Sequence, residues 1–89
     1  MTIKKGFVIK EIAGQYVVVA LGDASKVFNG IIKLNESGKL IWEMIANGKT
    51  RAQIIDTMLE SYGDVDRQTA EADFDKFVAI LKGANIIGE

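Results

Sequence analysis

The sequence predicts an α+β domain in which a three-stranded antiparallel sheet is followed by three helices that cover one face of the sheet. Two observations carry this prediction. Up to residue 34, apolar residues cluster in short β-branched stretches, as in strands; from residue 35 they recur about every 3.6 residues, as in helices. The 89 residues are enough for one hydrophobic core, so we expect a single domain over residues 1–89.

The first two strands are predicted to form a β-hairpin. Residues 7–12 and 16–21 are rich in β-branched and aromatic side chains, and a short link containing a glycine separates them. The second stretch is apolar on both faces, which suits a central strand, so residues 30–34 are expected to pair beside it. Residues 22–29 are predicted to be a loop anchored by Val27 and Phe28.

Helix boundaries follow from capping residues. The first helix is expected to start at the N-cap Asn35 and to stop at Gly48. The second opens with a capping box at residues 50–53 and closes at Gly63, and Asp66 caps the third. The apolar residues expected to face inward are Leu40, Ile41, Trp42, Met44 and Ile45, then Ile54, Ile55, Met58, Leu59 and Tyr62, then Ala70, Phe74, Phe77, Val78 and Leu81.

The composition argues against an enzyme. The chain has no histidine and no cysteine, so the commonest general base, metal ligands and nucleophile are missing, and we expect no catalytic residue, no metal and no cofactor. Glu71, Asp73 and Asp75 could form a carboxylate pair for acid–base chemistry. They are better interpreted as a solvated helix face with ion pairs such as Asp73 with Lys76.

Length and hydropathy also argue against a membrane or secreted protein. The longest apolar run, residues 16–21, is far shorter than a spanning helix requires, and the first residues lack the apolar segment of a signal peptide. We therefore expect a cytoplasmic protein.

A small sheet with helices is also the layout of a winged-helix protein that binds nucleic acid or regulates transcription, and this alternative stays open. The charge opposes it: the net charge is −1 and the pI about 5.4. Between residues 50 and 62 the only cation is Arg51, which Asp56 and Glu60 oppose, whereas a helix that reads DNA presents a basic face.

A surface groove is the remaining candidate site. Ile80 lies off the buried stripe of its helix, beside Phe77, and the strand at residues 30–34 offers unpaired backbone groups if it lies at the edge of the sheet. An edge strand beside an apolar groove can bind a peptide as an added strand. The alternative, equally open, is that residues 86–87 cover Ile80 and that Val27 and Phe28 cover the strand.

The segment LNESGKLIW at residues 34–42 resembles the step from third strand to helix in the PqqD family. Residues 48–55 are similar to the start of that family's second helix, and residues 77–87 to its closing motif, with Ala84 or Asn85 where glycine is usual. The resemblance implies a winged helix-turn-helix-like domain that binds the leader of a ribosomally made precursor peptide. It also implies delivery of that peptide to a modifying enzyme, often a radical S-adenosylmethionine (SAM) enzyme.

The resemblance further implies which residues bind the leader. In the family the leader pairs with the third strand and lies against the third helix. The corresponding residues here are Ile31, Ile32, Lys33, Asp73, Lys76, Phe77 and Ile80. The expected partners are thus a leader peptide and a modifying enzyme, not nucleic acid or membrane, and the expected state is a monomer or a weak homodimer formed through the open edge.

Overall fold

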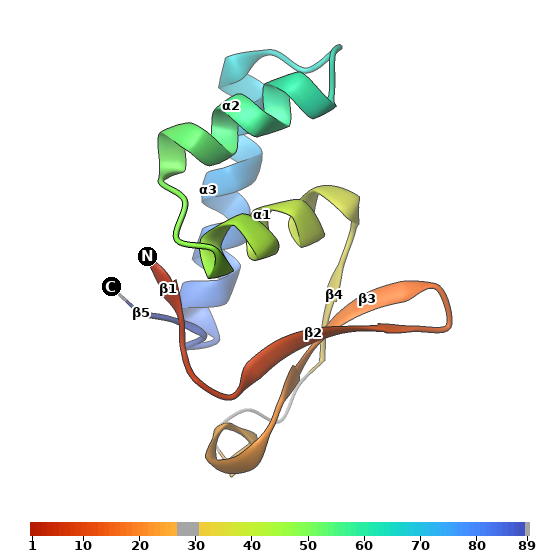
Figure 1. Ribbon diagram of the computed structural model, residues 1–89, viewed down its shortest axis with the longest axis vertical. Helices are drawn as coiled ribbons and strands as arrows, with labels where there is room; N and C mark the ends of the chain where they lie inside the picture. Colours follow the sequence, from red (N-terminus) through yellow and green to blue (C-terminus); the bar gives the residue numbers. More distant parts are fainter. Residues whose placement is uncertain (27–30, 89) are drawn as a thin grey trace.

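The computed structural model describes residues 1–26 and 31–88, and it confirms the predicted α+β class (Figure 1). A three-stranded antiparallel sheet, in the order β2-β3-β4, lies on one side of three helices. A two-stranded sheet joins the ends of the chain. The elements are β1 (Thr2–Ile3), β2 (Phe7–Ile12), β3 (Gln15–Ala20), the 3-10 helix η1 (Gly22–Lys26), β4 (Ile32–Leu34), α1 (Glu36–Ala46), α2 (Arg51–Ser61), α3 (Arg67–Gly83) and β5 (Ile87–Gly88).

The hairpin of β2 and β3 turns through two residues rather than the three that the sequence suggested. Ala13 and Gly14 both have positive φ, 51° and 80°. This combination is typical of a type I′ turn, whose twist matches that of the flanking strands. Gln15 is therefore already part of β3, where it pairs with Ile12.

β4 is shorter than predicted. Residues 30–34 were expected to form it, but the strand comprises Ile32–Leu34 and Ile31 precedes it, while Gly30 lies outside the described residues. The expected loop after β3 contains a 3-10 helix, η1, which has too few residues to show a period in the sequence. The proposed anchors Val27 and Phe28 also lie outside the described residues.

α1 begins and ends as its capping residues predict. The Asn35 side-chain oxygen accepts hydrogen bonds from the Gly38 amide at 2.8 Å and from the Ser37 hydroxyl at 2.9 Å. At the other end, Gly48 has φ 78°, and the amides of Gly48 and Lys49 donate to carbonyls of the last helical turn. This is the Schellman arrangement that favours glycine.

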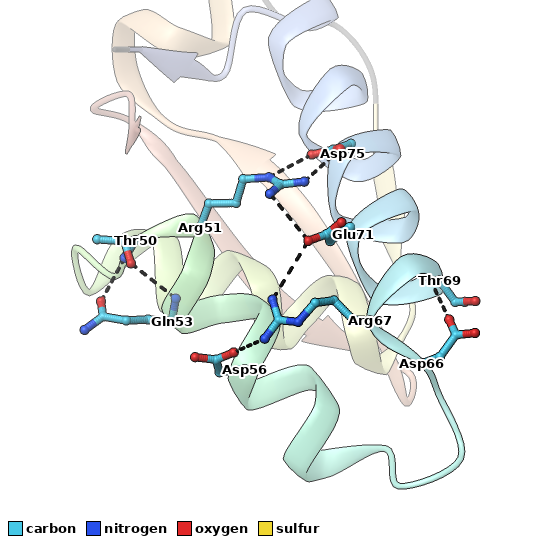
Figure 2. Close-up of polar contacts among 9 residues, drawn as sticks. All are labelled: Thr50, Arg51, Gln53, Asp56, Asp66, Arg67, Thr69, Glu71 and Asp75. Atoms are coloured by element: carbon cyan, nitrogen blue, oxygen red, sulfur yellow. Dashed lines mark hydrogen bonds and ion pairs between the residues drawn. The ribbon is translucent and has the colours of Figure 1, made fainter.

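α2 and α3 are joined by ion pairs between their exposed faces (Figure 2). Arg51 donates two hydrogen bonds to Asp75, at 3.2 and 3.0 Å, and this contact raises the pKa of Arg51. Arg67 pairs with Asp56, and Glu71 lies 4.0 Å from Arg51 and 3.9 Å from Arg67. Acidic residues of α3 thus form ion pairs as predicted, although within the described residues Asp73 and Lys76 do not pair with each other.

Both helices also have the predicted N-caps. Thr50 and Gln53 form a reciprocal capping box at the start of α2. The Asp66 carboxylate accepts a 2.7 Å hydrogen bond from the Thr69 amide at the start of α3. This bond stabilises the ionised carboxylate and lowers the pKa of Asp66 below its ordinary value of 3.8.

The core lies between the sheet and the helices. Cross-strand partners Ile9 and Val18 share a face with Ile32, and Val18 is fully buried. Trp42 is 4% exposed, as expected of a core aromatic residue. The buried residues of this cluster are Phe7, Val18, Leu34, Ile41, Trp42, Ile45, Ile54, Ile55, Met58, Ala70, Phe74, Val78, Leu81, Ile86 and Ile87.

The two ends of the chain meet in a small sheet that the sequence did not reveal, because strands of two residues have no readable period. Thr2 pairs with Gly88 and Ile3 with Ile87. The turn that leads into β5 depends on Asn85, whose φ is 62°. Asn85 occupies the left-handed position after α3, and asparagine is the residue that best tolerates this conformation after glycine.

Candidate functional site

The outer edge of β4 is open in the part of the chain that the structure describes. β4 pairs with β3 on one side only, so part of its backbone N–H and C=O groups point away from the sheet. Such an edge is a template for pairing with another strand. The prediction of an edge strand is therefore confirmed for residues 32–34.

A groove of about 280 Å³ runs between this edge and α3. Leu34 and Ile41, both almost fully buried, lie at its base, and Phe77 and Ile80 contribute from α3. Ile80 is 49% exposed, although it is a large apolar residue. The groove therefore combines an apolar lining with an open strand edge.

Gly38 allows α3 to approach the start of α1 closely. A Cβ added to Gly38 would lie 3.3 Å from Cε1 of Phe77 and 3.2 Å from the capping oxygen of Asn35. Both distances are tighter than ordinary contacts between carbon and its neighbours. The absence of a side chain at Gly38 thus makes room for the Phe77 ring, which lines the groove.

The charged residues of the groove are free to pair with a ligand. Lys33 comes from β4, and Asp73 and Lys76 come from α3. Within the described residues, none of the three forms a salt bridge or a side-chain hydrogen bond that holds it in place. The groove therefore offers two cations and one carboxylate that lie beside an apolar surface.

The structure brings together most of the predicted binding residues. Lys33, Asp73, Lys76, Phe77 and Ile80 all line the groove. Ile31 and Ile32 do not line it: Ile31 is 72% exposed ahead of β4, and Ile32 packs against the core. These two residues can contribute only through their backbone or through contacts outside the groove.

Sequence reasoning missed the end of the groove at the start of α1. Asn35, Ser37 and Gly38 line it together with Leu34 and Ile41. Asn35 was predicted to cap the helix and Ile41 to face the core, and neither was expected to contact a peptide. The available signal was their position directly after the binding strand, which places the helix start next to whatever the strand binds.

The surface of α2 does not resemble a DNA-reading face. Its only cation, Arg51, is paired with Asp75, and the next cation along the chain, Arg67, is paired with Asp56 (Figure 2). Cations that are held in ion pairs with the same molecule are poorly placed to neutralise phosphates. This arrangement adds to the charge argument against nucleic-acid binding.

Two other features bear on function in residues 1–26 and 31–88, namely metal sites and membrane-spanning helices. Among these residues there is no group of three or more acidic side chains that could hold a metal ion. None of the helices there has the length and hydropathy needed to cross a bilayer.

Comparison with known proteins identifies relatives of the fold. The family model described as coenzyme PQQ synthesis protein D (PqqD) matches residues 10–87. The solved structure of TbiB1 in complex with the TbiA(beta) leader peptide is 27% identical, with a TM-score of 0.77, over 97% of this chain and 93% of that one. Lasso peptide synthetase B1 complexed with the leader peptide is 20% identical, with a TM-score of 0.73, over 94% and 92% of the two chains. None of the curated proteins matches the chain.

Proposed function

The chain belongs to the PqqD family, and from this premise we propose that it binds the leader of a ribosomally made precursor peptide as an added strand at β4. The observation that carries the proposal is the open edge of β4 beside the groove formed with α3. Strand addition supplies backbone hydrogen bonds, while alternate side chains of the peptide enter the groove and give specificity.

The groove chemistry is consistent with this mode of binding. Phe77 and the exposed Ile80 offer apolar area that a peptide side chain would remove from water. Lys33 and Lys76 suit carboxylates of the peptide, and Asp73 suits a cation. Ile31, Ile32 and Lys33 supply the backbone against which the leader would pair.

The structural relatives support the same role. TbiB1, which is 27% identical to this chain, was solved with a leader peptide. Lasso peptide synthetase B1, also solved with a leader peptide, is 20% identical, and that likeness concerns the fold alone.

The protein is proposed to be a recognition module rather than a catalyst. Its sequence has no histidine or cysteine, and the groove residues are suited to binding rather than to proton transfer. The bound leader would then be presented to a separate modifying enzyme, for which a radical SAM enzyme is the expectation from the family. Without peptide, the open edge can pair with a second copy, so a monomer or weak homodimer is expected.

Calorimetry with the synthetic cognate leader peptide tests the proposal. Ile80→Asp places a charge on a surface that the peptide must desolvate, so binding should weaken by roughly 2 kcal/mol or more. Ile12→Asp is the matched control, because Ile12 is 55% exposed and lies on β2, the opposite edge of the sheet. Equal affinity of the Ile80 variant and the parent would reject the proposed groove.

A further inference from the structure

A second hollow, of about 440 Å³, lies where the start of α1 meets the end of α2 and the following turn. Met58, Tyr62 and Val65 give it an apolar lining; Met58 is 2% exposed and the other two are half-buried. Its remaining lining residues are all polar, and the charged ones among them are the carboxylates of Glu36, Asp64 and Asp73.

This hollow continues the groove beside β4. Asn35, Ser37 and Asp73 line both cavities. A peptide that leaves the edge of β4 at the Leu34 end therefore meets the hollow next. The two cavities form one path around the start of α1.

The charge of the hollow differs from that of the groove. The groove contains Lys33 and Lys76, whereas no lysine or arginine lines the hollow among the described residues. The surrounding segment, residues 54–75, has seven carboxylate side chains and one cation, Arg67, which is paired with Asp56. The N-terminus of α1 contributes about half a positive charge, which offsets only part of the three carboxylates in the hollow.

We propose that the hollow is a second subsite for the bound peptide and that it takes a lysine or arginine side chain flanking the strand-forming segment. This inference rests on the proposed leader binding at β4. The long aliphatic part of either side chain suits the lining of Met58, Tyr62 and Val65, and its charged end can reach Glu36, Asp64 or Asp73. An acidic side chain would be repelled by these carboxylates, and an apolar one would gain nothing from them.

The test is a selection of random 15-residue peptides by mRNA display on the folded protein. Peptides that bind the parent should share an apolar segment and, at a fixed distance from it, a lysine or arginine. Peptides selected on the Asp64→Asn variant should no longer share that cation but should still share the apolar segment. Glu60→Gln is the matched control, since Glu60 is an exposed carboxylate of α2 that does not line the hollow, and it should leave the preference unchanged.

Affinity measurements with one selected peptide then quantify the contact between its cation and Asp64. Asp64→Asn and replacement of the peptide cation by glutamine should each weaken binding about three- to fivefold, and both changes together should weaken it no more than one alone. The loss of affinity caused by each single change should be smaller in 0.5 M salt. Selected peptides that depend on Ile80 but show no basic preference would refute the subsite and leave the proposed function standing. Failure to select any peptide, or binding insensitive to Ile80→Asp, would refute both.

Discussion

Phe77 of α3 lies against Gly38 of α1, so close that a Cβ on the glycine would come within 3.3 Å of the ring. This contact joins the start of α1 to the lining of the groove. The capping oxygen of Asn35 is slightly closer, at 3.2 Å from the same Cβ position. A side chain at residue 38 would therefore crowd both the helix cap and the aromatic ring.

Gly38→Ala should therefore disturb the groove. Alanine normally stabilises a helix by about 0.5–1 kcal/mol relative to glycine, but here the methyl group must displace Phe77 or Asn35. We expect a loss of about 1 kcal/mol in the free energy of unfolding and weaker peptide binding. Gly83→Ala in α3 is the control, because a Cβ there meets nothing within 4 Å, and it should raise stability by about 0.5 kcal/mol. Urea unfolding of both variants measures these changes. A gain in the free energy of unfolding for Gly38→Ala would contradict the prediction.

Trp42→Ala should mainly destabilise the fold. The side chain is 4% exposed within the core, so truncation leaves a large cavity and should cost about 3–5 kcal/mol of unfolding free energy. Chemical denaturation followed by circular dichroism measures this loss. An unchanged midpoint would mean that the tryptophan does not contribute to the core.

Asn85 should be replaceable by glycine but not by alanine. Its φ of 62° costs alanine about 1 kcal/mol more than asparagine or glycine. Asn85→Ala should lower the melting temperature and loosen the pairing of β1 with β5, whereas Asn85→Gly should lose only the hydrogen bond from Lys4. Thermal melts compare the two variants. Equal melting temperatures would mean that the backbone at residue 85 is not strained by alanine.

The stability of α3 should depend on pH through Asp66. Its pKa is lowered in the folded protein by the hydrogen bond from the Thr69 amide, so its contribution is present above pH 3.8 and is lost as the pH falls through the lowered value. Asp66→Asn keeps a capping oxygen without a titrating carboxylate. Melts between pH 6 and pH 2.5 should show the parent losing stability relative to this variant only at the acid end. Parallel curves for the two proteins would contradict the assignment.

The sequence was sufficient for the elements whose signals are local. The caps Asn35, Thr50 and Asp66 and the change of period at residue 35 predicted α1, α2 and α3 because capping and amphipathicity are properties of neighbouring residues. The pairing of Thr2 with Gly88 was not predictable, since it joins residues from opposite ends of the chain in strands too short to be periodic.

Only part of the groove was predictable from the sequence, because only part of it depends on local patterns. Ile80 stood out because it departs from the stripe of its own helix, and the structure shows it exposed rather than covered by the C-terminal residues. The approach of Gly38 to Phe77 depends on how α1 and α3 pack, which no local pattern reveals. The assignment of Ile31, Ile32, Lys33, Asp73, Lys76, Phe77 and Ile80 to peptide binding stays a prediction.

An NMR titration of the isotope-labelled protein with its cognate leader peptide tests the central claim most directly. If the leader adds as a strand, amide shifts should appear at residues 31–33 and at Phe77 and Ile80, because these flank the new strand. Residues 51–56 of α2 should not shift. Shifts confined to residues 51–56, with none in β4 or α3, would contradict binding at the β4 edge.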